Sequence, residues 1–355
     1  MIKKICVEEN TLHFREPFTI AYETVRSAAV VILHLHDEKG RIGLGSAAPD
    51  PYVTGETAPA AHGVLRRLCN KKFFNLPLEE WHRYHEKIQN VFKGFPSAQS
   101  AVEEAIFNLL SVRQDRRVTS FFGGYRESCK AVITIGISDQ EHTVQEVKKR
   151  LKQGFSIIKL KCGNDLEDDI QKICEIRKII PKNKKLLLDA NQGYSPREAT
   201  QLLRAIKRLD ILGIEQPIAA RNIGGLRKLR SLQLVPIIAD ESASTVADAV
   251  KLLAGEYVDG VNIKLMKHGG PICSAEIFHI AKRLSKLTIL GCMYESNISI
   301  TTGARLALAL PFDFVDLDSG HLDFYDDPTR GGAYIENGEI KIKGAVKLTK
   351  PICIQ

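Results

Sequence analysis

The sequence predicts a parallel (β/α) barrel preceded by a smaller α+β region. From residue 129 onward, short apolar runs typical of buried strands recur at a nearly constant spacing, and each is followed by a segment with apolar residues at helical steps. Eight such runs over about 200 residues are the expected content of a barrel, whereas an open doubly wound sheet usually stops at about five to seven strands. The phosphate-binding patterns GxGxxG after an early strand and GxxxxGK[ST] are absent, which argues against a nucleotide-binding open sheet.

The barrel domain is predicted over residues 121–330. Its eight expected strands are AVITIGI, IIKLK, KLLLDA, ILGIEQP, VPIIAD, DGVNIKL, LTILGC and FDFVDLD, which begin at residues 131, 157, 185, 211, 235, 259, 287 and 312. Between them, segments such as 167–180 and 196–209 have the three- and four-residue apolar steps of amphipathic helices. Strands that alternate with helices favour a parallel sheet.

Residues 1–120 are predicted to form a separate α+β domain. Segments 2–14 and 28–36 alternate between apolar and polar residues as strands do, and helical patterns follow around 81–92 and 97–114. The glycine-rich stretch 40–55 contains many turn-forming residues and is expected to be an irregular loop.

The last predicted segment, residues 331–355, contains two short strand-like pieces. They flank Asn337 and Gly338, a dipeptide that is a strong signal for a β-hairpin turn.

Composition places the chain among ordinary globular proteins, with 44% hydrophobic and 26% charged residues. The net charge of +8 is dispersed over predicted helix faces, so we expect no nucleic-acid partner. No apolar run approaches the roughly 20 residues needed to span a bilayer, and Glu8 and Glu9 stand where a signal peptide would be apolar. We therefore expect a cytoplasmic protein without a membrane partner, and leave a homo-oligomer open.

Three consecutive predicted strands end in a carboxylate: Asp189, Glu215 and Asp240, about 25 residues apart. The carboxyl ends of barrel strands meet on the face where barrel active sites lie. Each acid alone could be the cap of the next helix, but three in register favour a common site. An all-oxygen set without Cys or His suits Mg²⁺, so the sequence predicts one Mg²⁺ per subunit here.

Lysines flank these carboxylates in the predicted barrel. Strand alternation places Lys159 and Lys161 on one face of the second strand, and the sixth strand ends in Lys264. Burial close to a second ammonium and to Mg²⁺ disfavours a charged lysine, which can then act as a base. Lys161 and Lys264 are expected on opposite sides of the carboxylates, so that one can remove an α-proton and the other can return it.

The order KLK, DAN, EQP, ADES and NIKL resembles the enolase superfamily, specifically its muconate lactonizing enzyme subgroup, over nearly the whole chain. The resemblance implies a (β/α)7β TIM-like barrel with an N-terminal α+β capping domain that the C-terminal tail completes. It also implies that Lys161 and Lys264 are the acid/base pair, that Lys159 assists, and that Mg²⁺ is bound by Asp189, Glu215 and Asp240. Sites of this superfamily combine a Lys or His base with Mg²⁺.

Two further motifs are similar to those of the dipeptide epimerases, in which paired aspartates hold the substrate's α-ammonium. They are GCMYES, which contains Met293 and Tyr294, and DLD, which contains Asp316 and Asp318. Two carboxylates on one strand face suit a primary ammonium, although capping or solvation is the alternative. Met293 and Tyr294 are expected to line the substrate pocket, with aromatic packing as the alternative for Tyr294.

Loops 18–26 and 49–55 of the capping domain are expected to cover the site. In epimerases that act on Ala-Glu, an Arg in the first loop receives the glutamate side chain, and the matching position here is Glu23. Together with Asp50, Glu23 favours a cationic or neutral dipeptide, although both can equally be exposed charges. Arg26 lies close enough in sequence to leave an acidic substrate open.

These features predict a Mg²⁺-dependent isomerase, a dipeptide epimerase that inverts the α-carbon of the C-terminal residue of an L,L-dipeptide. The expected route is a two-base 1,1-proton transfer through an enediolate. Alternatives in the same subgroup are o-succinylbenzoate synthase, N-acylamino acid racemase and muconate cycloisomerase, whose substrates offer no free ammonium to Asp316 and Asp318. A basic barrel that binds nucleic acid or an acidic partner without catalysis is the alternative from another class.

Overall fold

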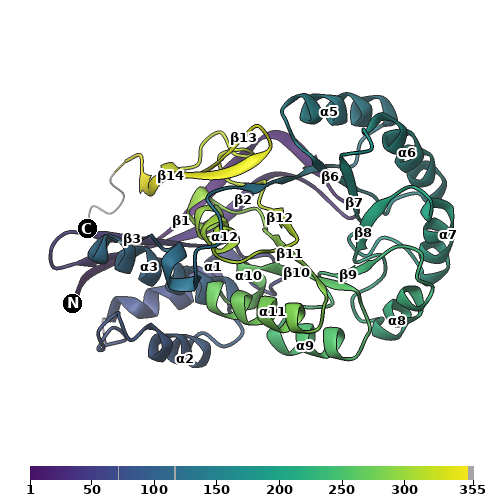
Figure 1. Cartoon of the computed structure of the whole chain (residues 1–355). Helices are drawn as coiled ribbons and strands as arrows, with labels where there is room; N and C mark the ends of the chain where they lie inside the picture. The colour runs from purple at the N-terminus through teal and green to yellow at the C-terminus, as the bar shows by residue number, and fades with distance from the viewer. Residues whose placement is uncertain (71, 116, 351–355) are drawn as a thin grey trace.

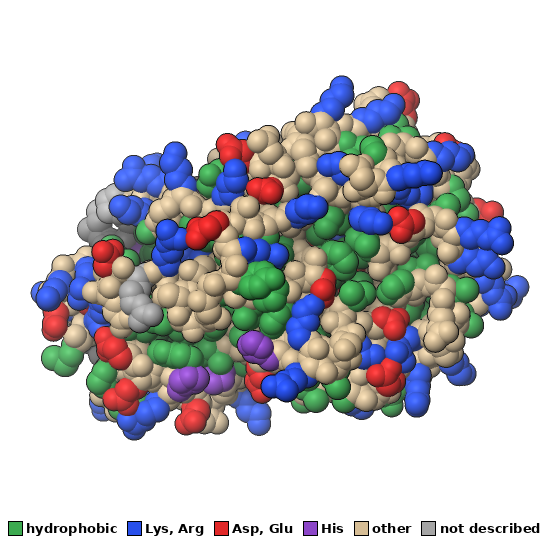
Figure 2. Space-filling model, in the orientation of Figure 1, with side chains coloured by type: hydrophobic (Ala, Val, Ile, Leu, Met, Phe, Trp, Pro, Cys, Tyr) green, Lys and Arg blue, Asp and Glu red, His purple; other side chains and the backbone are tan. Residues whose placement is uncertain are grey.

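The computed structural model describes residues 1–70, 72–115 and 117–350. Figure 1 shows the strands and helices of the N-terminal region at one end of the molecule and a ring of helices around parallel strands at the other. Lys and Arg side chains are scattered over the face drawn in Figure 2 and do not gather in one patch. Among the residues that the structure describes, no helix is long and apolar enough to cross a membrane.

The capping domain is an antiparallel sheet covered on one face by helices. Its elements are β1 (Ile2–Thr19), β2 (Thr24–Asp37), β3 (Ile42–Ala47), α1 (Ala58–Leu65), the 3₁₀ helix η1 (Arg66–Asn70), α2 (Trp81–Val91), α3 (Pro96–Gln114) and α4 (Thr119–Phe122). Alternation along β2 sends Val31 and Leu33 into the core beneath the helices, while Val30 and Ile32 join the larger core that includes the barrel. The predicted strands and helices of this region are therefore present, with longer strands than expected.

The glycine-rich stretch 40–55 differs from the sequence prediction, because it contains β3 and is not irregular throughout. Two glycines of this strand allow α3 to pack closely against it. A Cβ on Gly43 would collide with Ala105 O, and a Cβ on Gly45 would collide with Ala101 O. These glycines therefore provide space for a helix backbone and do not mark turns.

The barrel strands run parallel in sequence order, which confirms all eight predicted strands. They are β5 (Val132–Ile135), β6 (Ile157–Lys161), β7 (Lys185–Asp189), β8 (Ile211–Glu215), β9 (Ile237–Ala239), β10 (Gly260–Lys264), β11 (Leu287–Gly291) and β12 (Phe314–Asp316). The alternate strands β7, β9 and β11 contribute Leu187, Ile238 and Ile289 to one small buried cluster. Side chains of alternate strands meet in this way in the interior layers of a barrel.

Helices connect successive strands, and no barrel helix follows β12 in the described residues up to 350, so the topology is (β/α)7β. The helices are α5 (Gln140–Lys152), α6 (Leu166–Ile179), α7 (Pro196–Ile206), α8 (Ile223–Ser231), α9 (Val246–Ala254), the single turn α10 (Leu265–His268), α11 (Pro271–Arg283) and α12 (Asn297–Ala309). All of them except α10 and α11 begin after a capping side chain; Ser195, for example, forms a capping box with Glu198 at α7.

The C-terminal hairpin of β13 (Thr329–Glu336) and β14 (Glu339–Leu348) forms around Asn337 and Gly338, as the sequence predicts. It pairs with β4 (Cys129–Lys130), directly before the first barrel strand, and Ala131 N donates to Gly338 O at 2.9 Å. The turn therefore docks beside the start of β5, while the chain just before the hairpin contacts the capping domain, where Tyr325 N donates to His13 O at 3.3 Å. That residues 331–355 return to the capping domain stays a prediction. Residues 351–355 of the predicted segment lie outside the described residues.

Candidate active site

Lys159 occupies the centre of the polar group at the carboxyl ends of the barrel strands. Its Nζ lies 2.9 Å from Asp189 Oδ2, 3.0 Å from Glu215 Oε1 and 2.8 Å from Asp316 Oδ2. Only 4% of its side chain is exposed. Burial opposes the charged form, but the three carboxylates raise the pKa of Lys159 well above its ordinary value. Lys159 is therefore an ammonium that joins strands β6, β7, β8 and β12.

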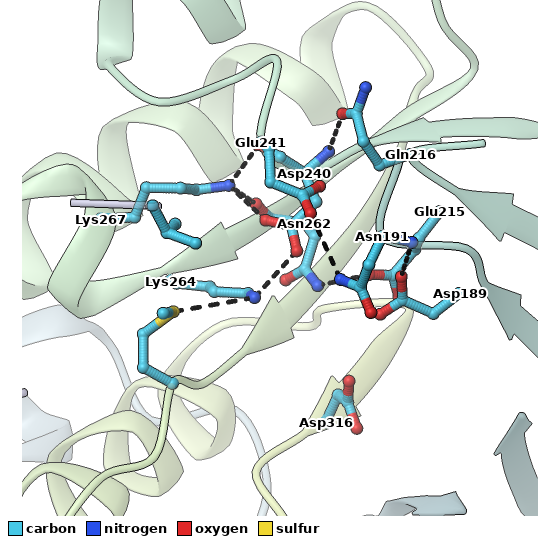
Figure 3. A network of polar contacts seen from close by, with 12 residues as sticks. Asp189, Asn191, Glu215, Gln216, Asp240, Glu241, Asn262, Lys264, Lys267 and Asp316 are labelled. Atoms are coloured by element: carbon cyan, nitrogen blue, oxygen red, sulfur yellow. Dashed lines mark hydrogen bonds and ion pairs between the residues drawn. The ribbon is translucent and has the colours of Figure 1, made fainter. Parts of the chain in front are cut away.

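The two predicted acid/base lysines reach this group from different strands. Lys161 Nζ donates to Asp189 Oδ2 at 2.8 Å and to Asn191 Oδ1 at 2.7 Å. Lys264 Nζ lies 2.8 Å from Asp240 Oδ2 (Figure 3). Three strands separate β6 from β10 in either direction around the barrel, so these lysines stand on opposite sides of it.

The sequence argument concerned Lys161, with Lys159 as the second cation. At Lys264, burial and the charge of Lys159 oppose the ammonium, but the pair with Asp240 outweighs them and raises the pKa of Lys264. The nearest charge to this ammonium is a carboxylate, and the net effect is therefore to hold the proton.

The three predicted metal ligands are buried and close enough to influence one another. Although burial raises the pKa of Asp189, ion pairs with Lys159 and Lys161 hold it below its ordinary value. The lysine pairs of Asp240 have the same effect. Burial, with the negative charges of Asp189 and Asp240, raises the pKa of Glu215 to about 7. The lysines thus keep Asp189 and Asp240 ionised, while Glu215 is the acid whose ionisation its negative neighbours oppose.

The donor chemistry of Asp189, Glu215 and Asp240 fits a hard divalent cation, since all six oxygens belong to carboxylates. Glu215 Oε1 is buried and accepts no hydrogen bond, although the Lys159 ammonium lies 3.0 Å away. Each carboxylate presently faces a lysine, and over residues 1–70, 72–115 and 117–350 no group of three or more His, Cys, Asp or Glu side chains is arranged to hold a metal. The residues therefore fit Mg²⁺ in kind, with ammonium groups as their present partners.

Several polar residues that support these carboxylates were missed by the sequence analysis. Gln216 accepts from Asp240 N at 3.1 Å and from Ser242 N at 3.0 Å, with its own backbone at a φ of 35°. Asn262 Nδ2 donates to Glu215 Oε2 at 2.8 Å. The signal for Gln216 was its place in EQP, directly after a predicted ligand.

A second supporting chain leads to Lys161. Asn191 Oδ1 accepts a hydrogen bond from Lys161. Asn191 Nδ2 donates to Glu241 Oε1 at 3.2 Å, and both of these residues are labelled in Figure 3. Both residues were visible in the motifs DAN and ADES, next to predicted ligands. The other oxygen of Glu241 is buried and has no hydrogen-bond partner. Glu241 also lines a cavity above the polar group.

A cavity of about 360 Å³ lies above this polar group, between the barrel and the capping domain. Most of the predicted site residues line it: Lys159, Lys161, Lys264, Asp240, Met293, Tyr294, Asp316, Asp318, Glu23 and Asp50. Asp189 and Glu215 lie beneath, where they contact Lys159. The structure thus brings the predicted catalytic, metal and substrate residues to one place.

The two aspartates of DLD meet Thr134 of β5 at one side of the cavity. Thr134 N donates to Asp318 Oδ2 at 2.6 Å, and Thr134 Oγ1 donates to Asp316 Oδ1 at 3.3 Å. These bonds also link β12 to β5. Burial and the charge of Asp316 raise the pKa of Asp318 to about 6. The single positive charge of Lys159 therefore does not balance the two carboxylates of Asp316 and Asp318.

Met293 and Tyr294 follow β11, the strand paired with β12, and line the cavity beside the aspartate pair. Met293 Sδ lies 3.9 Å from Lys264 Nζ. Tyr294 lines the cavity and also packs edge-on against Phe14 at 5.1 Å, so both interpretations of this residue hold. Phe18 also lies edge-on to Tyr294, with the two ring centres 6.2 Å apart.

Glu23 and Asp50 face the cavity from two capping-domain loops. Burial and the charge of Asp50 raise the pKa of Glu23, which indicates that the two carboxylates are neighbours. Asp50 is fixed by its own loop, because its Oδ1 accepts from Tyr52 N at 2.7 Å and Val53 N at 2.9 Å. Arg26 is exposed on β2 and is not among the lining residues.

Comparison with known families matches both parts of this architecture. The "Mandelate racemase / muconate lactonizing enzyme, N-terminal domain" model covers residues 1–123, and the "Enolase C-terminal domain-like" model covers residues 142–346. The chain belongs to the mandelate racemase/muconate lactonizing enzyme family of the enolase superfamily. The expected fold and family are therefore confirmed.

Individual relatives cover nearly the whole chain. An L-Ala-D/L-Glu epimerase of Clostridium acetobutylicum is 32% identical, with 96% of both chains covered. A hydrophobic dipeptide epimerase of Enterococcus faecalis is 31% identical over 94% of this chain and 95% of its own. The crystal structure of a Methylococcus capsulatus dipeptide epimerase, complexed with Mg and L-Arg-D-Lys, superposes with a TM-score of 0.90 at 30% identity, covering 97% of this chain and 98% of that one.

Proposed function

We propose that this member of the family is a Mg²⁺-dependent dipeptide epimerase, an isomerase that inverts the α-carbon of the C-terminal residue of an L,L-dipeptide. The observation that carries the proposal is the placement of Lys161 and Lys264, which face one cavity from opposite barrel strands. Relatives with three different dipeptide specificities support the reaction but do not select the substrate.

The two lysines provide the proton transfer. An α-carbon held between them offers one face to each, so a neutral lysine removes the α-proton and the opposite ammonium delivers a proton to the other face. The intermediate is the enediolate of the substrate. Lys159, buried and held by three carboxylates, remains an ammonium and contributes fixed positive charge below the reacting carboxylate.

Asp189, Glu215 and Asp240 are the residues that would hold Mg²⁺, one ion per subunit. When bound, the ion would stabilise the negative charge that develops on the substrate carboxylate. The three carboxylates supply negative charge and oxygen donors for the ion. An added cation would also lower the raised pKa of Glu215, because it offsets the neighbouring negative charges.

The remaining groups select the substrate. Asp316 and Asp318 form an anionic pair suited to the free α-ammonium of a dipeptide. Glu23 and Asp50 lie at the cavity on the capping-domain side and favour a cationic or neutral side chain over the glutamate of Ala-Glu.

The test is a pooled L,L-dipeptide library incubated with the protein and Mg²⁺ in heavy water. Each epimerised dipeptide gains one deuteron at its α-carbon, which mass spectrometry detects. We expect dipeptides with cationic or apolar C-terminal residues to gain mass faster than Ala-Glu. If no dipeptide exchanges while calorimetry shows bound Mg²⁺, the dipeptide assignment is wrong. The substrate would then be sought among o-succinylbenzoate precursors, muconates and N-acyl amino acids.

A further inference from the structure

A second lysine of β10 and its turn, Lys267, binds the same carboxylate as Lys264 but does not enter the cavity. It lies on the single turn α10, three residues after Lys264, and its side chain is fully buried. Lys264 lies 2.8 Å from Oδ2 of Asp240, and Lys267 lies 2.7 Å from Oδ1 (Figure 3). Each oxygen of this predicted ligand therefore has its own ammonium.

The ammonium of Lys267 has all its donors engaged. Besides Asp240 Oδ1, it donates to Asp240 O at 2.7 Å and to Asn262 O at 3.0 Å. An ammonium has three N–H donors, and these three acceptors use them. Lys264 differs, because beyond Asp240 its contact is the distant sulfur of Met293. Lys267 thus has no hydrogen to offer a substrate, and its role must be exerted through its partners.

Those partners connect two of the predicted metal ligands. Asp240 is held by both its side chain and its carbonyl, and Asn262, whose carbonyl accepts from Lys267, donates its amide to Glu215 Oε2 at 2.8 Å. The turn that carries Lys267 is itself fixed by α3 of the capping domain: a Cβ on Gly269 or Gly270 would collide with Gln99 or Glu103. Lys267 is therefore held both by the acceptors of its ammonium and by the close packing of the following glycines against α3.

We propose that Lys267 is a positioning residue that fixes Oδ1 of Asp240 and leaves Oδ2 facing the cavity, so that a divalent cation finds this ligand already oriented. The inference rests on the metal site of the proposed function. Without Lys267, Asp240 can rotate and turn both oxygens to Lys264, which would oppose binding of a cation. The charge of Lys267 repels a cation, but the favourable orientation of Asp240 outweighs this repulsion.

The test is calorimetric titration of the full chain with Mn²⁺ alone, without dipeptide. Lys267→Met is expected to weaken Mn²⁺ binding at least tenfold, while thermal unfolding shows that the variant is folded. The matched control is Lys286→Met, since Lys286 is a similarly buried lysine that pairs with Glu256 away from the cavity. It is expected to bind Mn²⁺ as the unmodified protein does.

If Lys267→Met does not fold, Lys267→Gln replaces it, because glutamine keeps donors for the two carbonyls while removing the charge. Unchanged Mn²⁺ affinity in either folded variant overturns the proposal. An unmodified protein that binds no Mn²⁺ overturns the metal site and Lys267's role together. Mn²⁺ binding that depends on Lys267, without dipeptide exchange, supports Lys267 and removes only the dipeptide substrate.

Discussion

The barrel strand ends and the capping-domain loops meet at one cavity but hold their charges in different ways. At the strand ends, Lys159 alone binds three carboxylates, and every acid of the group has a lysine or amide partner at a defined distance. In the loops, Glu23 has Asp50 for a neighbour, and burial beside this like charge raises its pKa. The strand-end network holds its atoms in fixed positions for a reaction. The carboxylates of Glu23 and Asp50, by contrast, favour a ligand of positive charge.

The largest expected effect comes from the network side of this comparison. Lys161→Ala and Lys264→Ala should each lower the kcat of epimerisation by about 10² to 10⁴-fold, because a positioned acid or base contributes this much. The remaining lysine can still exchange the α-proton of the diastereomer that faces it. Deuterium incorporation into each separate diastereomer, followed by NMR, measures both effects.

A matched control for these variants is Lys185→Ala. Lys185 begins β7 at the opposite end of the barrel and pairs with Asp210, outside the cavity. It should turn over at the unmodified rate. Full activity of both Lys161→Ala and Lys264→Ala would contradict the two-base mechanism.

A smaller effect is expected from the loops. Glu23→Arg replaces an uncompensated acid by a cation at the cavity, so the ratio of kcat/KM for cationic over acidic C-terminal residues should fall about tenfold, equivalent to about 1.4 kcal/mol. Competing L-Ala-L-Lys and L-Ala-L-Glu in one assay gives this ratio directly. Glu38→Arg makes the same change of charge at the far end of β2 and should leave the ratio unaltered. An unchanged ratio in Glu23→Arg would remove Glu23 from the specificity determinants.

The same contrast explains how much the sequence could predict. The spacing of apolar runs predicted all eight barrel strands, because each strand is a local run of the sequence. It also predicted where the charged strand ends meet, because the side chain at a strand end has a fixed direction. Lys267 and Asn262 were missed because their roles depend on three segments far apart in sequence. The lysine was nevertheless visible in the sequence, directly after the motif NIKLM.

The prediction of an irregular loop was wrong where glycines serve close packing and do not mark turns. The stretch 40–55 has the composition of a loop, yet Gly43 and Gly45 sit in a strand because α3 leaves no room for a side chain. The tail hairpin shows a similar limit. Its turn was predictable from Asn337 and Gly338, but its partner β4 has only two residues and leaves almost no periodic signal.

The boundary between the two regions also contains the buried acid Glu104 of α3. Its Oε2 accepts from Ser46 N of β3 and lies 3.1 Å from Ser299 Oγ of α12, so one carboxyl group joins the capping domain to the barrel. Burial and the negative charge of Glu295 raise its pKa well above the ordinary value. Glu104 therefore retains its proton in the folded protein at pH values where the unfolded chain releases it.

The smallest expected effect follows from this proton. A folded-state pKa above the unfolded value adds stability that is complete below about pH 4.5 and is lost as the pH rises toward the folded pKa. Glu104→Gln keeps the side-chain shape but removes the titrating carboxyl group. As the pH rises above about 4.5, the free energy of unfolding of this variant should therefore fall less steeply than that of the unmodified protein, by up to about 1.4 kcal/mol per pH unit. Urea unfolding at several pH values measures the slopes. Glu127→Gln, at a side chain that is 90% exposed, should match the unmodified slope, and an identical slope for Glu104→Gln would mean that Glu104 is ionised in the folded protein.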